Sequence, residues 1–209
     1  PGQELTYTCA PPGSGIRMGI DRDVDGILDG DEGAPPPPAG CSLAPQSGCA
    51  LPGNSLLIVK QSAVPEKDKV TWKWLQGTIA APDFGAPDIA DGYALCVYQG
   101  GSRILNAQAP AAGTCGSKPC WRSDAAGGFR YTDSAKTPNG LLKLLLKAGT
   151  GTAKIIVKGK GANLTLPSLP LTTPFTVQVQ GSHGKCWEHD YDRAGVVRND
   201  SAQFKGNGG

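Results

Sequence analysis

Closely spaced acidic residues near the start of the chain have the spacing of a calcium-binding loop. Residues 21–32 contain five Asp and one Glu, and Gly26 stands at the sixth position. In a twelve-residue calcium loop, oxygen ligands occupy positions 1, 3, 5, 7, 9 and 12, and Gly at position 6 permits the sharp bend. The predicted Ca²⁺ ligands are five carboxylates and one backbone carbonyl, from Asp21, Asp23, Asp25, Ile27, Asp29 and Glu32.

The acidic loop resembles the calcium loops of EF-hands, dockerins and thrombospondin type 3 repeats, and the resemblance covers only residues 21–32. Gly13, Gly15 and Gly19 precede the loop, and Gly33 and four prolines follow it. These residues exclude the helix pair that flanks an EF-hand loop. The resemblance therefore implies a calcium ion that rigidifies an interdomain connection. The alternative is a solvated acidic turn with no ion.

The order of segments along the whole chain also resembles an architecture of secreted bacterial proteins. A Tyr-Thr-Cys-Ala-Pro-Pro-Gly-Ser-Gly stretch leads into the acidic loop, and a cysteine-rich part with Cys-Trp pairs follows. This resemblance implies an extracellular, Gram-negative setting, and it implies no activity.

Catalytic chemistry has little support in the sequence. Glu188, His189, Asp190 and Asp192 form the one local cluster of acids and histidine. The cluster lacks the His-x-x-x-His or Cys-x-x-Cys spacing of a strong metal site. No Gly-x-Ser-x-Gly motif, phosphate-binding loop or dinucleotide fingerprint occurs. We therefore expect that the protein is not an enzyme.

Seven cysteines in a chain rich in Gly and Pro indicate disulfide bonds and an oxidising compartment. Six of them follow the proline-rich linker, which leaves Cys9 over. Cys9 is a candidate for a bond to another chain; the alternatives are a free thiol and a cysteine that has lost its partner. Six cysteines allow 15 pairings, so spacing alone does not decide the connectivity. The preferred set has two local bonds and one long-range bond: Cys41–Cys49, Cys115–Cys120 and Cys96–Cys186.

From residue 41 onward the sequence predicts short strands separated by turns. Val70, Trp72 and Trp74 alternate with Thr71 and Lys73, which places one face of a strand in a core and the other in water. The predicted strands are 54–60, 69–75, 93–98, 102–107, 128–132, 141–147, 152–158, 174–180 and 184–188. Such a series predicts a mainly β fold, an antiparallel β-sandwich that is Ig-like.

The interior of that sandwich is predicted to hold Phe175 and Val177 beside the two tryptophans, with Thr176 and Gln178 in water. Trp121 and Trp187, which each follow a cysteine, could instead stack on carbohydrate. Core packing is the preferred interpretation because the chain has few large apolar residues.

Four regions follow from these patterns. Residues 1–20 form an N-terminal arm with a lone strand at its start, residues 21–32 the calcium loop, residues 33–40 a polyproline linker and residues 41–209 the disulfide-bonded sandwich. Four consecutive prolines favour an extended polyproline II spacer. The chain opens with Pro and has no export signal, so we interpret it as a mature product.

Charge is distributed unevenly along the chain. Residues 1–33 hold seven acids and two bases, a net charge of −5, whereas the remainder holds 18 bases and 11 acids, a net charge of +7. The basic part has no dense Lys and Arg cluster interleaved with aromatics, so nucleic acid is a poor candidate partner. No apolar run is long enough for a transmembrane helix.

These features predict an extracellular or cell-surface structural protein. We expect a homo-oligomer, a head-to-tail polymer in which residues 4–10 of one subunit add a strand to the sandwich of the next. A lone N-terminal strand, a rigid spacer and a calcium loop fit such a filament. In the alternative, residues 4–10 fold back onto their own sandwich or belong to an upstream domain. The alternative is a surface- or carbohydrate-binding module of a larger secreted protein, with a polysaccharide as the partner.

Overall fold

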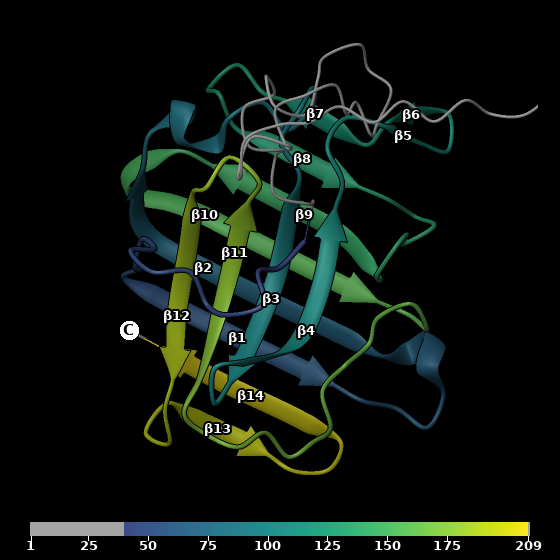
Figure 1. The fold of residues 1–209 in the computed structure, drawn as a ribbon, viewed down its shortest axis with the longest axis vertical. Helices are drawn as coiled ribbons and strands as arrows, with labels where there is room; N and C mark the ends of the chain where they lie inside the picture. The colour runs from purple at the N-terminus through teal and green to yellow at the C-terminus, as the bar shows by residue number, and fades with distance from the viewer. Residues whose placement is uncertain (1–39, 209) are drawn as a thin grey trace, which may run out of the picture. The chain divides into compact units, whose positions relative to one another are not determined.

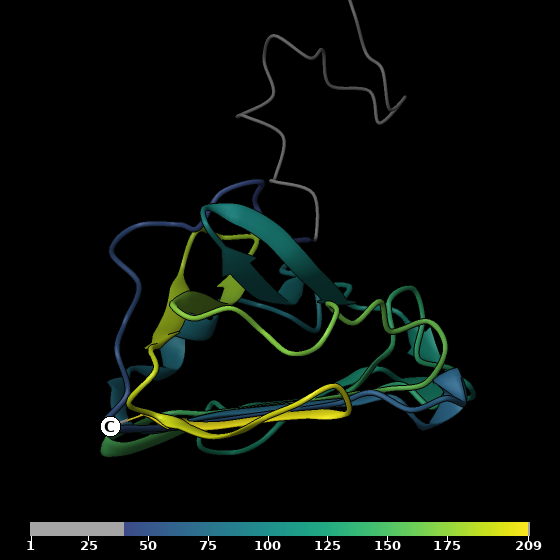
Figure 2. The ribbon, with the colours of Figure 1, turned by 90° about the horizontal axis from the view of Figure 1, so that it is seen from below.

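Two antiparallel β-sheets lie face to face in the part of the chain that the structure describes. The structure is a computed structural model that describes residues 40–208. Figures 1 and 2 show the two sheets as separate layers, the larger one nearly flat in the edge-on view. The predicted strand at residues 4–10, the calcium loop and nearly all of the proline linker lie outside the described residues.

The larger sheet has eight strands in the order β13-β14-β1-β2-β10-β9-β8-β7. All neighbouring strands in it are antiparallel. The strands are β1 (Asn54–Lys60), β2 (Lys69–Ile79), β7 (Trp121–Ser123), β8 (Phe129–Thr132), β9 (Leu141–Lys147), β10 (Gly149–Lys160), β13 (Val196–Asn199) and β14 (Gln203–Gly208).

The smaller sheet has four antiparallel strands in the order β12-β11-β3-β4. A short separate hairpin and two 3-10 helices complete the described part. The elements are β3 (Tyr93–Gln99), β4 (Ser102–Ala109), β11 (Phe175–Gly181), β12 (Cys186–Tyr191), the hairpin strands β5 (Thr114–Cys115) and β6 (Lys118–Pro119), and the helices η2 (Pro65–Lys67) and η3 (Ala81–Phe84).

The core fills the space between the two sheets. Trp72 on the central strand β2 lies opposite Leu57 and Val157, and all three are buried. Trp74, two residues further, points the same way because side chains alternate along a strand. A buried tryptophan removes roughly 150–250 Å² from water, which is worth about 4 to 6 kcal/mol. The predicted core positions Trp72, Trp74, Phe175 and Val177 are all confirmed as buried.

A segment without regular structure, residues 40–52, runs over the outer face of the small sheet; we call it the strap. A disulfide joins Cys41 to Cys96 on β3, and another joins Cys49 to Cys186 on β12. Between them the backbone N–H of Gln46 donates to the side-chain oxygen of Gln178 at 3.0 Å. The strap therefore covers a sheet face that would otherwise be exposed to water.

The strap explains one wrong prediction about the small sheet. Gln178 was expected in water because it alternates with the core residues of its strand, but it is completely buried. It does point away from the core, as predicted, and its amide donates to the backbone oxygen of Gln46 at 2.8 Å and to the carboxylate of Glu188 at 2.6 Å. A buried amide is tolerated here because its donors and acceptors are paired.

The predicted disulfide connectivity is also corrected. All six cysteines in the described part are paired, and the local Cys115–Cys120 bond is confirmed. The other two preferred pairs are wrong. The structure joins Cys41 to Cys96 and Cys49 to Cys186, because the strap crosses from β3 to β12 and bonds to the strand below it at each end.

The antiparallel β-sandwich predicted from the sequence is confirmed, with 4% helix in the structure. Each of the nine predicted strands corresponds to an observed strand, and the segment 141–147, also compatible with a helix, is β9. Five observed strands were not predicted: β5, β6, β7, β13 and β14. All five are short or rich in Gly and polar residues, so their periodicity is weak.

Candidate functional site

Most of the predicted site residues belong to the chain before residue 40. The calcium ligands and Cys9 lie outside the described residues, so their prediction rests on the sequence: Cys9, Asp21, Asp23, Asp25, Ile27, Asp29 and Glu32. Within residues 40–208, no cluster of three or more His, Cys, Asp or Glu side chains has an arrangement that would hold a metal ion. No helix in the same residues is long and apolar enough to span a bilayer.

The acid and histidine cluster near the end of the chain is divided by the strand that carries it. His189 is paired with the core residue Val177, and its ring lies 4.9 Å from that of Tyr191. Glu188 and Asp190 point to the opposite face of the small sheet, because neighbouring side chains on a strand alternate. Burial lowers the pKa of His189. The cluster therefore does not converge on a common ligand.

The tryptophans that could have stacked on a carbohydrate are inside the protein. All four are at most 2% exposed: Trp72, Trp74, Trp121 and Trp187. Trp121 donates its indole N–H to the backbone oxygen of Pro110 at 2.7 Å, and its ring lies 5.1 Å from that of Tyr131. The core-packing interpretation is confirmed for Trp121 and Trp187.

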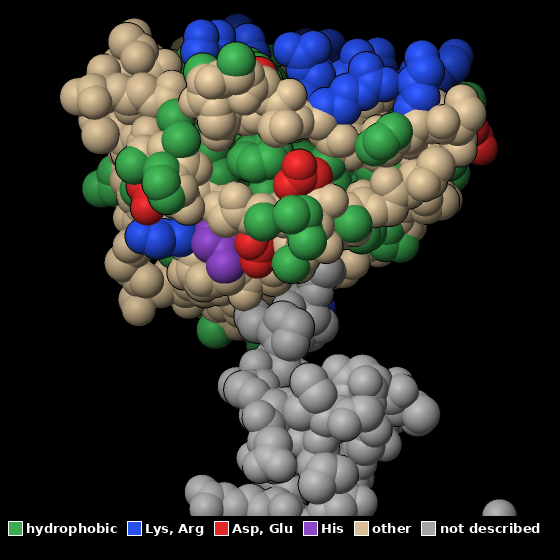
Figure 3. All heavy atoms as spheres, turned by 90° about the horizontal axis from the view of Figure 1, so that it is seen from above, with side chains coloured by type: hydrophobic (Ala, Val, Ile, Leu, Met, Phe, Trp, Pro, Cys, Tyr) green, Lys and Arg blue, Asp and Glu red, His purple; other side chains and the backbone are tan. Residues whose placement is uncertain are grey.

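A dense array of cations covers the outer face of the large sheet. The eight strands of this sheet contain no Asp or Glu, and their Lys and Arg side chains point away from the core. Figure 3 shows Lys and Arg side chains gathered along this side of the molecule. We call this surface the basic face and define it by Lys60, Lys69, Lys73, Arg122, Arg130, Lys143, Lys147, Lys154, Lys158, Lys160, Arg198 and Lys205.

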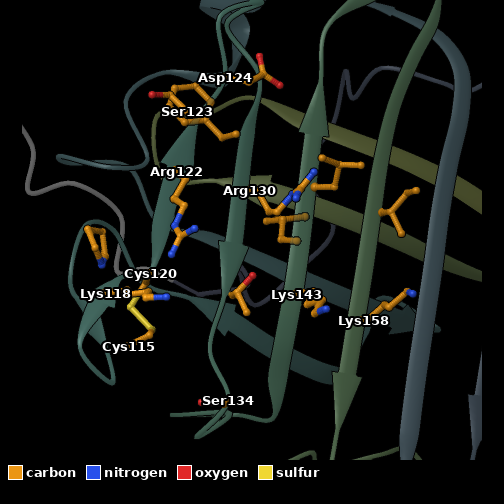
Figure 4. Close-up of a pocket in the computed structure, with 16 residues that line it drawn as sticks. Cys115, Lys118, Cys120, Arg122, Ser123, Asp124, Arg130, Ser134, Lys143 and Lys158 are labelled. Carbon is orange, nitrogen blue, oxygen red and sulfur yellow. A yellow bond between two sulfur atoms is a disulfide. The ribbon is translucent and has the colours of Figure 1, made fainter.

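One end of the basic face is hollowed into a groove of about 720 Å³. Its floor is formed by four adjacent strands, β7 to β10, and the hairpin β5–β6 with its Cys115–Cys120 disulfide stands at one side (Figure 4). Leu145 and Ile156 supply an apolar part of the floor. The lining includes five cationic side chains: Lys118, Arg122, Arg130, Lys143 and Lys158.

The cations of the groove have no acidic partner in the described part of the chain. Asp124 is the one acidic residue of the lining, and its carboxylate accepts backbone N–H groups of Ala126 and Gly128, both at 2.9 Å. The ion pairs within residues 40–208 involve Lys185, Arg198 and His183. The groove can therefore attract an anion such as a phosphate or carboxylate.

The edge of the small sheet at β4 is a second candidate site. Within residues 40–208, β4 pairs with β3 alone, and no backbone hydrogen bond joins its other side to the protein. It has eight residues, no Pro and one charged side chain, Arg103. Its inward side chains are Leu105, Ala107 and Ala109. An open edge of this length presents backbone donors and acceptors to another strand.

The other three sheet edges are shorter or partly occupied. On β12, Ala50 of the strap donates its N–H to the oxygen of Cys186 at 2.9 Å and accepts from Glu188 at 3.0 Å. At the two ends of the large sheet, β7 has three residues and β13 has four. Among the described strands, β4 is thus the longest edge that remains open.

Comparisons with known proteins give no relative. No family model matches the chain, no curated protein matches it, and no solved structure resembles it within the limits of the search. Arguments about function therefore start from the residues and their geometry.

Neither the basic face nor the open edge of β4 was predicted from the sequence. The bases of this face are spread from residue 60 to residue 205, so the sequence shows no dense cluster of Lys and Arg. One signal was available, since Lys154 and Lys158 recur at even spacing in the predicted strand 152–158 and Lys160 continues that spacing. Sequence alone does not show which strands are neighbours, and the density of charge depends on that neighbourhood.

Proposed function

We propose that the protein is an extracellular structural protein that assembles head to tail, with the β4 edge accepting residues 4–10 of the next subunit. The observation that carries this proposal is the open side of β4, an eight-residue edge with one charged side chain. Native sheets normally protect such edges with charges, prolines or covering segments. An edge left without this protection fits a role in strand addition.

Residues 4–10 have a sequence that suits this edge. Leu5, Tyr7 and Cys9 alternate with more polar residues, so one face of an added strand would be mainly apolar. The inward positions of β4 next to that face include Ala107 and Ala109, which are small and buried in the core. The apolar face of residues 4–10 also fixes the register of the added strand on β4, because a shift by one residue would turn its apolar side chains toward water.

The cysteine count supports contact between chains. The six cysteines of the described part form three bonds with one another, so none of them is left for Cys9. The three disulfides also fit an oxidising, extracellular compartment. A heterologous contact of this kind does not close on itself, so repeated addition produces a fibre.

We propose that the acidic loop binds one Ca²⁺ and stiffens the connection between the strand and the sandwich. The ligands are those predicted from the spacing: Asp21, Asp23, Asp25, Ile27, Asp29 and Glu32. Calcium brings together carboxylates that would otherwise repel one another. A rigid connection would limit the range of angles between neighbouring subunits.

The alternative, a polysaccharide-binding module, has less support. Carbohydrate sites of this kind depend on exposed aromatic rings, and all four tryptophans are buried. A binding function would instead use the basic groove and an anionic ligand.

Electron microscopy of the purified protein tests the assembly. We expect filaments for the natural chain, fewer or more irregular ones after calcium chelation, and none after deletion of residues 1–10. A more specific test compares the variant Thr8→Pro with its control Thr8→Ala. Proline removes a backbone hydrogen-bond donor from the added strand, and alanine does not. Filaments that persist in Thr8→Pro and in the deletion would refute strand addition.

A further inference from the structure

We propose that the basic face docks onto a lipid bilayer rich in anionic headgroups. This inference goes beyond the assembly proposed above and does not depend on it. It rests on the charge, the shape and the composition of the outer face of the large sheet.

The charges of the basic face are arranged at a cost to stability. Lys143 lies directly opposite Lys158, Lys147 opposite Lys154, and further like-charged pairs occur in other strands. The other directly opposed pairs are Lys60 with Lys69, Lys69 with Lys160, Arg122 with Arg130 and Arg198 with Lys205. Like charges directly opposite each other destabilise a sheet. A face that only had to be soluble would be served better by mixed signs.

The shape of the face matches a plane of headgroups. The large sheet is nearly flat in the edge-on view (Figure 2), and its strands are roughly 4.8 Å apart, so the cations form a two-dimensional array. A bilayer surface offers an array of phosphates in the same way. Each Lys or Arg near an anionic bilayer adds to the attraction, so the eleven bases other than Arg198, which is paired with Asp200, bind together even though each contact is weak.

The composition of the face also suits a bilayer. Nine of its twelve bases are Lys, whose long apolar stem can lie among lipid groups while the ammonium reaches a phosphate. Between the bases lie aliphatic side chains that are half-buried: Leu56, Ile58, Leu75, Leu145 and Ile156. A shallow mixture of aliphatic and cationic groups is typical of a surface that binds at the headgroup level.

Other polyanions fit the face less well. No aromatic side chain points outward from the eight strands, so there is no platform on which nucleobases or sugar rings could stack. The groove adds a place for one headgroup to bind more closely, since Arg122, Arg130 and Lys143 line it from three neighbouring strands (Figure 4).

Co-sedimentation of the full chain with vesicles tests the docking. We expect binding to vesicles of equal parts phosphatidylglycerol and phosphatidylcholine, and none to phosphatidylcholine alone. Raising the salt from about 0.1 M to about 1 M shortens the Debye length from about 10 Å to about 3 Å and should release the protein. Salt-independent binding, or equal binding to both kinds of vesicle, would contradict an electrostatic surface.

A pair of double variants assigns the binding to this face. Lys143→Gln with Lys158→Gln removes two opposed charges and should weaken vesicle binding by about 30-fold. Lys185→Gln with Arg103→Gln removes the same charge from the small sheet and the loop before β12, and should leave binding within about twofold. The double variant at Lys143 and Lys158 removes a repulsion between the two side chains. The urea concentration at its unfolding midpoint should therefore not fall.

Three outcomes would overturn the proposal. The first is an equal loss of binding in both double variants, which would indicate net charge alone. The second is binding to heparin or duplex DNA with no binding to the anionic vesicles. The third is vesicle binding by the protein that lacks residues 1–33 but not by the full chain, which would make the acidic arm the occupant of the face. Filament formation is scored separately by microscopy, so either proposal can fail alone.

Discussion

Lys143 on β9 lies directly opposite Lys158 on β10, and both side chains are exposed on the outer face of the large sheet. No Asp or Glu occurs in any strand of that sheet to neutralise them. The outer face is therefore not optimised for the stability of the fold, because an acidic residue at either of the two positions would replace a repulsion by an attraction.

Lys158→Glu should therefore stabilise the protein. It replaces a repulsive cross-strand pair by an attractive one, and we expect the free energy of unfolding to rise by about 0.5 kcal/mol. Urea unfolding at low salt measures the change. Lys158→Gln, which only removes the repulsion, should give a smaller gain. Equal stability of Lys158→Glu and Lys158→Gln, or a loss in Lys158→Glu, would contradict a repulsive interaction between the two lysines.

The three disulfides should differ in how much they stabilise the fold. The bonds close sequence separations of 137, 55 and 5 residues, for which chain entropy predicts about 5, 4 and 2 kcal/mol. The expected order of loss on replacement by Ala pairs is Cys49–Cys186, then Cys41–Cys96, then Cys115–Cys120. Urea unfolding of the three double variants gives the order. Equal losses would mean that packing in the folded state outweighs chain entropy.

Stability should fall as the pH drops below about 6.5, the ordinary pKa of histidine. Burial lowers the pKa of His189, although Asp190 and Asp192 act in the opposite direction. The folded protein thus binds a proton less readily than the unfolded chain. The stability that neutral His189 contributes is complete above about pH 6.5, and it is lost as the pH falls toward the lowered pKa. Unfolding midpoints measured from about pH 7 to pH 5 should decline, and less steeply in His189→Gln. The same slope in both proteins would exclude His189 as the cause.

Calcium should bind to the full chain at one site. Asp21→Ala removes a predicted ligand at the first position of the loop, so calorimetry should show binding weakened by at least about tenfold. Asp31→Ala is the matched control, because position 11 of the loop supplies no ligand. Absence of binding at about millimolar Ca²⁺, or equal effects of the two substitutions, would argue for a solvated acidic turn.

The sequence by itself determined the elements of the sandwich and the identity of its core. Alternation of apolar and polar residues is a local property, and it places Trp72, Trp74 and Phe175 inside whatever strands lie beside them. The same reasoning identified nine strands, among them all those of seven residues or more. It missed β13 and β14, which have little alternation, yet β14 pairs with β1 and extends the large sheet.

Only the tertiary structure decided which distant segments meet. Cys41 bonds to Cys96, and Gln178 is buried rather than solvated, because the strap lies over the small sheet. Lys143 and Lys158 form part of one charged face because β9 and β10 are neighbours. β4 offers an open edge because no described strand pairs with its outer side. Each of these features depends on contacts between residues far apart in the chain, and local periodicity contains no information about such contacts.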